Sequence, residues 1–147
     1  MSLRVAKAHA YGNDFLLVPG DSAWIAAIGD GASALARALC NRQKGIGADG
    51  LLVYDARDRG ATMRLFNADG TPSELSGNGL RCLAALLVRT QQLATTSVIA
   101  VDTDAGLKSV ELLGREGERY TFRSALGPPE DLREVAIPVG GESLTAS

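Results

Sequence analysis

Ser76-Gly-Asn-Gly-Leu-Arg-Cys-Leu-Ala-Ala-Leu-Leu-Val88 is the most informative segment of this 147-residue chain. From Leu80 to Val88 it is apolar on nearly all sides, a pattern typical of a buried helix rather than of a surface helix. Its polar opening residue and the following Gly-Asn-Gly indicate a helix start. We therefore predict a helix that begins at Ser76, continues to about Gln92 and is buried within the fold.

Short strand-like runs precede and follow this segment. One further helix is expected from about Ala32 to Gln43, capped by Asp30 and stopped at Gly45. Strands mixed with a few helices, in no βαβ rhythm, predict an α+β fold. The expected strands are Leu3–Val5, Phe15–Val18, Leu51–Tyr54, Thr62–Phe66, Ser97–Val101, Leu107–Leu113 and Tyr120–Arg123.

The C-terminal end reads differently from the rest. Pro128-Pro129 breaks the chain, and Val135–Val139 is expected to form one more edge strand. Residues 140–147 have the composition of a linker or tail. We expect one domain over residues 1–139, and a chain that resembles the first half of a larger architecture.

Composition excludes several classes of function. The formal charge is −2, which gives no footprint for nucleic acid or for an anionic membrane surface. No segment approaches the ~20 apolar residues of a membrane span, and the start of the chain lacks the hydrophobic region of a signal peptide. The two cysteines, Cys40 and Cys82, form neither a metal knuckle nor a disulfide framework, so a cytoplasmic location is expected.

Gly45-Ile-Gly-Ala-Asp-Gly50 matches the dinucleotide-binding pattern G-x-G-x-x-G. That motif needs a strand before the glycines and a helix after them, so that the pyrophosphate meets a helix N-terminus. Here a predicted helix precedes the glycines and a predicted strand follows them. A Gly-rich turn that ends a helix is the preferred interpretation.

Ser76-Gly-Asn-Gly79 places the amides of Gly77 and Asn78 at the positive end of the buried helix, a geometry that receives a carboxylate or phosphate. Plain N-capping by Ser76 is the alternative, and for this segment alone the better one. Asn13 and Asn67 lie in two further polar turns, where each residue either binds amino and carboxylate groups or holds its own turn. The single histidine and the lack of a ligand cluster favour neither a Ser-His-Asp site nor a metal site.

Four segments are informative when they are taken together, namely Lys7-Ala-His-Ala-Tyr-Gly-Asn-Asp-Phe15, Gly45-Ile-Gly-Ala-Asp-Gly50, Met63-Arg-Leu-Phe-Asn-Ala-Asp-Gly70 and Glu74-Leu-Ser-Gly-Asn-Gly-Leu-Arg-Cys82. In order and spacing they resemble the N-terminal half of the diaminopimelate epimerase family. The likeness extends from about Arg4 to Val139. Proline racemases and phenazine-pathway isomerases share the architecture, but Asn-Asp-Phe and Phe-Asn-Ala-Asp-Gly favour the diaminopimelate branch.

This resemblance implies two similar α+β halves, each a curved mixed or antiparallel sheet wrapped around a central buried helix, with substrate in the cleft between them. It implies an isomerase that converts LL-diaminopimelate to the meso form, in lysine and peptidoglycan-precursor biosynthesis, with neither pyridoxal phosphate nor metal. One thiol from each half acts: a thiolate removes the α-proton, and the other thiol protonates the opposite face.

Position by position, the resemblance implies substrate contacts at Asn13 and Asn67 and a carboxylate-binding amide pair at Gly77 and Asn78. A side-chain amide contact of some members falls near Gly50, where no side chain exists. Cys82 lies inside the expected buried helix and is interpreted as structural.

The family's first catalytic cysteine falls on Ser76, and a serine hydroxyl is a weak base without a neighbouring group to activate it. Three explanations remain open: an introduced Cys→Ser change, a natural residue in a divergent member with altered chemistry or substrate, or loss of catalysis with binding retained.

Three hypotheses follow from the sequence. The first is an amino-acid epimerase of which this chain is the N-terminal half, inactive alone because inversion needs an acid and a base on both faces. The second is a non-catalytic module that binds an amino acid or carboxylate. The third is a fragment whose exposed cleft wall pairs with a second copy.

Overall fold

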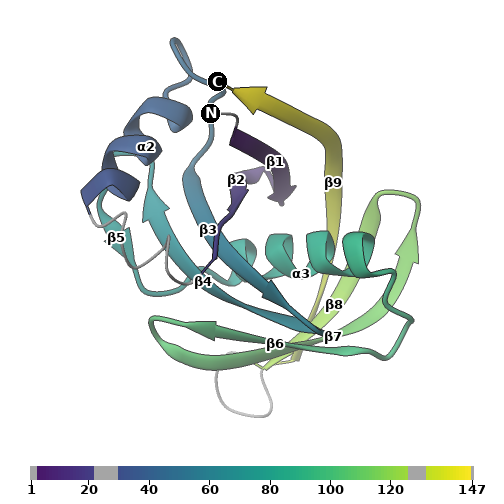
Figure 1. The fold of residues 1–147 in the computed structure, drawn as a ribbon. Coiled ribbons are helices and arrows are strands. Elements are labelled where there is room, and N and C mark those ends of the chain that lie inside the picture. The colour runs from purple at the N-terminus through teal and green to yellow at the C-terminus, as the bar shows by residue number, and fades with distance from the viewer. Residues whose placement is uncertain (1–2, 22–29, 126–131, 147) are drawn as a thin grey trace.

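The computed structural model describes residues 3–21, 30–125 and 132–146. Figure 1 shows one helix running through the middle of the molecule, with strands on several sides of it. The helices assigned within the described residues are α2 (Asp30–Cys40) and α3 (Gly77–Gln91). The strands are β1 (Leu3–Ala10), β2 (Asn13–Pro19), β3 (Gly50–Arg57), β4 (Gly60–Asn67), β5 (Pro72–Ser73), β6 (Val98–Thr103), β7 (Gly106–Glu116), β8 (Arg119–Ala125) and β9 (Leu132–Ala146).

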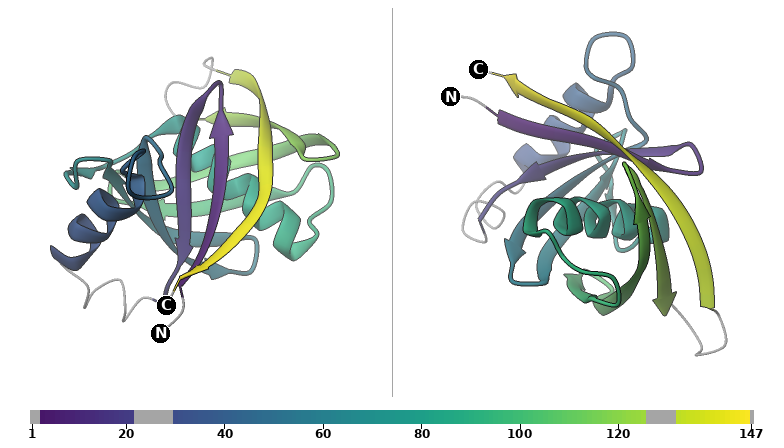
Figure 2. Two further views of the ribbon diagram at one scale, coloured as in Figure 1. Left: turned by 90° about the horizontal axis from the view of Figure 1, so that it is seen from above. Right: turned by 90° about the vertical axis from the view of Figure 1, so that its right-hand side faces the viewer.

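The strands form a single sheet in the order β3-β2-β1-β9-β8-β7-β6-β4-β5. β3 also pairs with β4, so the sheet closes on itself and the short β5 extends it beside β4. The β2–β3 and β4–β6 pairs are parallel and the other pairs are antiparallel. Figures 1 and 2 show this closed, mixed sheet surrounding α3. The expected α+β architecture, a curved sheet wrapped around a central buried helix, is confirmed.

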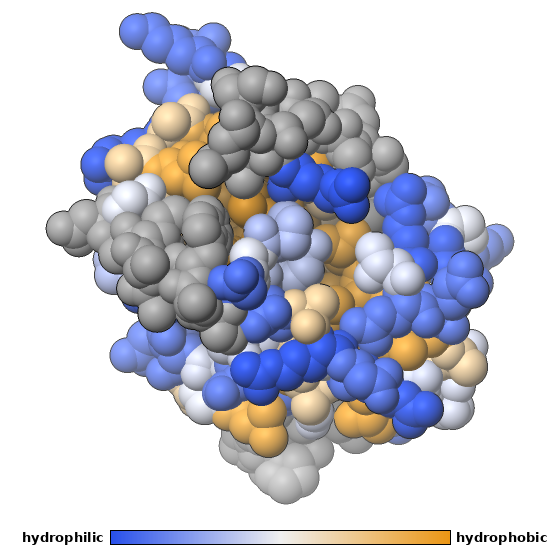
Figure 3. All heavy atoms as spheres, viewed as in Figure 1, coloured by the Kyte–Doolittle hydropathy of each residue, from blue (hydrophilic) through white to orange (hydrophobic). Residues whose placement is uncertain are grey.

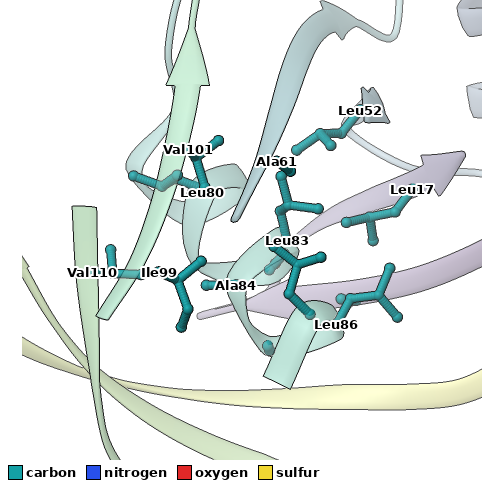
Figure 4. Packing of buried hydrophobic residues seen from close by; sticks show 14 of the residues in the cluster. Leu17, Leu52, Ala61, Leu80, Leu83, Ala84, Leu86, Ile99, Val101 and Val110 are labelled. Atoms are coloured by element: carbon teal, nitrogen blue, oxygen red, sulfur yellow. The ribbon is translucent and has the colours of Figure 1, made fainter. Parts of the chain in front are cut away.

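Helix α3 has the limits that the sequence predicts. Ser76 is its N-cap, and Gln92 ends it in the left-handed conformation with φ 53°. Every residue from Gly79 to Val88 is buried, because strands contact the helix on all sides. In Figure 4, Leu80 and Leu83 point among side chains of the surrounding strands. Burial of a leucine side chain stabilises a fold by roughly 1.5–3 kcal/mol, so α3 supplies much of the core.

Helix α2 lies outside the closed sheet, as Figure 1 shows, and contacts β3 and β4. Ala32 and Ala36 of this helix belong to a second apolar cluster that includes Leu16 and Val18 of β2. Leu17, which lies between them in sequence, faces the inner cluster around α3. Both faces of β2 are therefore buried, and this explains why its sequence is a continuous apolar run rather than an alternating one.

The end of α2 differs from the expected position at about Gln43. The helix ends at Cys40, and the Oδ1 atom of Asn41 accepts hydrogen bonds from the backbone amides of Gln43 at 2.9 Å and Lys44 at 3.0 Å. An asparagine side chain that bonds nearby backbone amides competes with helical hydrogen bonding. The helix therefore stops at this turn, before the glycines of the 45–50 segment.

The C-terminal end differs from two expectations. The strand predicted at residues 135–139 is confirmed as part of the longer β9, but its expected edge position is wrong, because β9 lies between β1 and β8. Residues 140–146, expected to be linker or tail, are also in β9, and Ala146 pairs with Leu3. The pairing of β9 with β1 is made by backbone groups and does not need a distinctive side-chain pattern. Since β1 also lies at the other end of the chain, the local sequence carried no signal for this pairing. The predicted break at Pro128-Pro129 lies outside the described residues.

On the face seen in Figure 3, hydrophilic side chains form a band across the lower half and along the right-hand side, and hydrophobic side chains are visible above and below that band. Three large hydrophobic side chains within the described residues are well exposed, namely Tyr11, Val98 and Leu107. In the described part of the chain, no helix has both the length and the apolar character needed to cross a membrane.

Candidate active site

Three strand ends and one helix start meet at the same end of the closed sheet. The register aligns Phe15 of β2 with Gly50 of β3, and Gly50 with Asn67 of β4. Asn13 begins β2, two positions before Phe15, and the chain reaches the N-terminus of α3 soon after β4 through β5. Residues that are far apart in the sequence are thus brought to one end of the molecule by the pairing of β2, β3 and β4.

Asn13 and Asn78, two of the predicted site residues, are in direct contact. The Nδ2 atom of Asn78 donates to the Oδ1 atom of Asn13 at 3.2 Å, across 65 positions of sequence. Both side chains are partly buried. The structure therefore joins the first polar turn of the chain to the N-terminus of the buried helix.

Ser76 caps α3 in the manner that the sequence indicates. Its backbone is extended, with φ −130° and ψ 125°, and its Oγ atom accepts a hydrogen bond from the amide of Gly79 at 3.1 Å. The amides of Gly77 and Asn78 belong to the first helical turn, where no preceding carbonyl is available to them within the helix. These two N–H groups and the helix dipole create positive potential suited to a carboxylate.

Asn67 lies at the same sheet end but holds its own turn. Its Nδ2 atom donates to the Oγ1 atom of Thr71 at 3.0 Å, and its backbone amide donates to the Thr71 carbonyl oxygen at 2.8 Å. The side chain is exposed. These contacts hold the turn at Asn67, and the register keeps the residue near the other candidate site residues, so substrate binding by Asn67 stays a prediction.

Asn13 lies beside a cluster of charged side chains, Asp14, Arg42 and Asp49, that the sequence patterns did not indicate. The Arg42 guanidinium bonds both oxygens of Asp14, at 2.8 and 3.1 Å, and one oxygen of Asp49 at 3.1 Å. The two acids are also joined through backbone: the Asp49 amide donates to Asp14 Oδ1 at 2.9 Å, and the Asp14 amide donates to Asp49 Oδ2 at 3.1 Å. This cluster fastens the loop before β3 to the start of β2.

Asp14 is strongly held in its charged form. Partial burial by itself favours the neutral acid, but hydrogen bonds from Arg42 and the Asp49 amide outweigh it, as do the charges of Arg42 and Lys7. Together these groups hold the pKa of Asp14 well below its usual range. Both acids lie within segments that carry the family resemblance, but no local pattern showed that they meet.

Arg81 is a further residue that sequence reasoning missed. Although α3 is otherwise apolar in its middle, this arginine is buried and only 9% exposed. Its guanidinium donates to Asn78 Oδ1 at 3.1 Å and to Ser124 Oγ at 2.8 Å. A charged residue in a fully buried helix is itself a signal, since such groups are retained with partners at defined positions.

Neither thiol of the chain is placed to act as a base. Burial raises the pKa of the Cys40 thiol to about 11 and that of the Cys82 thiol to about 12. Both side chains are nearly inaccessible, at 2% and 0% exposure. The interpretation of Cys82 as a structural residue agrees with these surroundings. His9 is exposed on β1, opposite Asp14 in the β1–β2 register.

Position 50 is closed to a side chain as it stands. A Cβ atom on Gly50 would lie 3.0 Å from the Phe66 carbonyl oxygen and 3.1 Å from the Phe15 ring. The predicted order around this glycine segment, with a helix before it and a strand after it, is observed. Across the residues that the structure describes, no group of three or more His, Cys, Asp or Glu side chains is placed to hold a metal ion.

Comparison with known proteins identifies a family match over most of the chain. The sequence model of the family described as diaminopimelate epimerase matches residues 5–130. Diaminopimelate epimerase of Halothermothrix orenii is 37% identical over 145 residues, a region that covers 97% of this chain and 49% of that protein. The chain thus spans about half the length of this relative.

Solved structures share the fold at low sequence identity. A protein from Pseudomonas aeruginosa described as a predicted epimerase superposes with a TM-score of 0.64 at 15% identity, over 83% of this chain and 42% of that one. A hydroxyproline epimerase from Agrobacterium vitis, solved with bound trans-4-hydroxy-L-proline, gives a TM-score of 0.59 at 18% identity, over 83% and 41% of the two chains. These likenesses confirm the architecture around α3.

Proposed function

This chain belongs to the diaminopimelate epimerase family, and on that premise we propose that it forms one half of an amino-acid epimerase site, with the N-terminus of α3 as the carboxylate-binding element. The observation that carries the proposal is the junction at Asn78. There, Asn78 Nδ2 in the first turn of a buried helix donates to Oδ1 of Asn13, the first residue of β2, at 3.2 Å.

The proposed ligand is the α-carboxylate of an amino acid. The amides of Gly77 and Asn78 supply donors at the positive end of α3, and a carboxylate placed there gains hydrogen bonds and dipole interaction together. The side chains of Asn13 and Asn78 add neutral polar groups beside it, and Asn67 lies at the same sheet end. By family membership, the proposed substrate is LL-diaminopimelate, with meso-diaminopimelate as product.

The proposed reaction removes the α-proton and returns a proton to the opposite face. The negative charge that develops spreads onto the carboxylate, where donors fixed at a helix N-terminus stabilise it without reorganisation. Inversion needs a base and an acid on opposite faces of the α-carbon. Ser76 adjoins the proposed carboxylate position on one face, and we propose that the second half of the site comes from further chain or from a second copy.

Ser76 makes a binding-only module the second candidate. A hydroxyl is a far weaker base than a thiolate, and its Oγ atom is already engaged by the Gly79 amide. Both thiols of the chain are buried, with raised pKa values, so neither replaces a base at this position. These observations favour carboxylate binding without catalysis as the alternative to epimerisation.

Exchange of the α-proton of LL-diaminopimelate in D2O, followed by NMR, tests the proposal. The samples are this chain, the chain joined to whatever second half its gene encodes, and both again with Ser76→Cys. We expect no net epimerisation by the 147-residue chain alone, because one face lacks its acid or base. Robust turnover by that chain would contradict the half-site.

The joined protein separates the two candidates. Exchange with Ser76 in place supports an epimerase that works with altered chemistry, and exchange only after Ser76→Cys supports an intact site silenced at one atom. Binding by calorimetry without exchange in either form supports the carboxylate-binding module. Absence of both binding and exchange would overturn the proposal, and light scattering decides whether a second copy completes the site.

A further inference from the structure

Four polar side chains form one continuous chain of hydrogen bonds across the candidate site. Arg81 donates to Asn78 Oδ1 at 3.1 Å, and Asn78 Nδ2 donates to Asn13 Oδ1 at 3.2 Å. Asn13 Nδ2 in turn donates to Asp49 Oδ2 at 2.8 Å. The chain starts at a buried guanidinium inside the closed sheet and ends at a carboxylate on the loop before β3.

The two terminal groups, the Arg81 guanidinium and the Asp49 carboxylate, determine which partner donates in each of these hydrogen bonds. A guanidinium is only a donor, and an ionised carboxylate is only an acceptor. Each asparagine between them can both donate and accept, so an amide alone has two possible orientations. With Arg81 at one end and Asp49 at the other, one orientation satisfies every link. Reversing Asn13 would place its oxygen against the Asp49 carboxylate and its N–H groups against those of Asn78.

We propose that Asp49 and Arg81 are positioning residues that fix the amide orientation of Asn13 and Asn78 before a ligand binds. An asparagine amide carries two N–H groups. The series of hydrogen bonds uses one N–H group of Asn13 and one of Asn78. The arrangement therefore determines which atoms of both amides remain for a ligand. Preorganised polar groups of this kind need no reorientation when a carboxylate arrives.

The two terminal residues of this series of hydrogen bonds, Asp49 and Arg81, are themselves held in place. Asp49 Oδ1 accepts from Arg42 at 3.1 Å, and Asp49 Oδ2 also accepts from the Asp14 amide at 3.1 Å. At the other end Arg81 is buried and bonds Ser124 Oγ at 2.8 Å. Because these terminal groups are fixed, the hydrogen bonds impose an orientation on the two asparagine amides that lie between them.

Asp49→Asn is the direct test, read by NMR of the side-chain amides in the full 147-residue chain. The substitution keeps the shape but replaces an acceptor-only group by one that donates or accepts. We expect the side-chain NH₂ signals of both Asn13 and Asn78 to shift, while the backbone amide signal of Asn78 stays in place. Asn78 is the informative reporter, because Asp49 reaches it only through Asn13.

Asp58→Asn is the matched control, since Asp58 is exposed in the turn between β3 and β4 and undergoes the same loss of charge. We expect it to leave the Asn78 side-chain signals unchanged. Side-chain signals of Asn78 that stay fixed in Asp49→Asn, or that move together with its backbone signal, would overturn the proposal. The first result would show that Asp49 does not influence the orientation of the Asn78 amide. The second would show that the helix start as a whole is rearranged.

A measurement on the unsubstituted chain keeps the proposal falsifiable if Asp49→Asn does not fold. A scalar coupling across the hydrogen bond, from Asn13 Nδ2 to the carboxylate carbon of Asp49, is expected. A coupling from Asn13 Nδ2 to a different acceptor would overturn the assigned direction.

The effect on binding rests on the proposed function. We expect Asp49→Asn to weaken binding of diaminopimelate about tenfold by calorimetry, as loss of one hydrogen bond to a charged group predicts, and Asp58→Asn to change it less than about twofold. If the unsubstituted chain binds no diaminopimelate while the NMR result holds, the proposed ligand is wrong and the positioning role stands.

Discussion

At the scale of single residues, the decisive atom is Oγ of Ser76. It accepts from the Gly79 amide and so completes the first turn of α3. We propose that it also occupies the position of the family's catalytic thiol. A hydroxyl serves the capping role well and the role of base poorly. The two thiols that the chain does possess are buried with raised pKa values. Under the proposed function, a serine at this position keeps the helix start intact for carboxylate binding and supplies only a weak base for proton transfer.

Ser76→Cys is expected to create one fast-reacting thiol. At the N-terminus of α3 the helix dipole lowers the pKa of a thiol below its usual ~8.5, so a larger fraction is thiolate near neutral pH. The rate of alkylation by iodoacetamide between pH 6 and pH 9 measures this. The parent chain, whose Cys40 and Cys82 are buried, is the control and should react only when unfolded. Equal rates for the two proteins would contradict the prediction.

Asp14 governs the acid side of stability. Its pKa is lower in the folded chain than in the unfolded chain, so it contributes stability above the unfolded pKa of ~3.9, and this is lost as the pH falls through the lower folded value. We expect Asp14→Asn to lower the free energy of unfolding at pH 7 and to flatten its dependence on pH below about pH 4. Urea unfolding from pH 7 to pH 2 measures both effects. A parallel pH profile in the two proteins would argue against this role.

At the scale of elements, α3 links the core to the proposed site. Its middle is enclosed on all sides and forms the core, while its first turn has backbone amides with no partner within the helix, at the proposed carboxylate position. Arg81 and Asn78 link the two parts, because the buried guanidinium bonds the side chain at the helix start. Packing of the helix body thereby fixes the position of the proposed carboxylate site.

Leu83→Ala is expected to destabilise the fold by about 2–5 kcal/mol, because its side chain is fully buried against the surrounding strands and its removal leaves a cavity. Leu107→Ala is the control, since Leu107 is 71% exposed, and it should change the free energy of unfolding by less than about 0.5 kcal/mol. Chemical denaturation gives both values. Similar losses in the two variants would show that α3 is not the core element described.

At the scale of the whole molecule, the closed sheet depends on β4, which pairs with β3 on one side and with β6 on the other. The parallel β4–β6 pairing is short and begins at Gly60, aligned with Ala100. A Cβ atom at position 60 would overlap the Ala100 carbonyl oxygen, far inside normal contact. Gly60 is thus required where two distant segments close the sheet around α3.

Gly60→Ala is expected to cost about 1–3 kcal/mol of folding stability, since backbone must shift to relieve the contact. Gly114→Ala is the control, because a Cβ atom there meets no atom within 4 Å. Thermal and chemical unfolding of both variants gives the comparison, and amide hydrogen exchange in β4 and β6 localises it. Loss of protection elsewhere, with β4 and β6 unchanged, would contradict a role in closure.

The sequence by itself determined the buried helix, the outer helix, the approximate position of most strands and the family to which the chain belongs. These follow from local patterns: apolar residues on all sides from Leu80 to Val88, polar turns between apolar runs, and four motifs at set spacing. Each strand proved longer than its apolar run, because backbone pairing continues past the residues that reveal it.

Only the tertiary structure decided how these pieces combine. The closure of the sheet, the central place of β9 and the hydrogen-bonded chain from Arg81 to Asp49 all join residues far apart in sequence. Register and side-chain contact over such separations depend on the packing of every intervening element, which no local pattern records. Asn13 and Asn78 could therefore be proposed as site residues one by one from the sequence, while the contact between them, and the charged groups that hold it, appear only once the chain is folded.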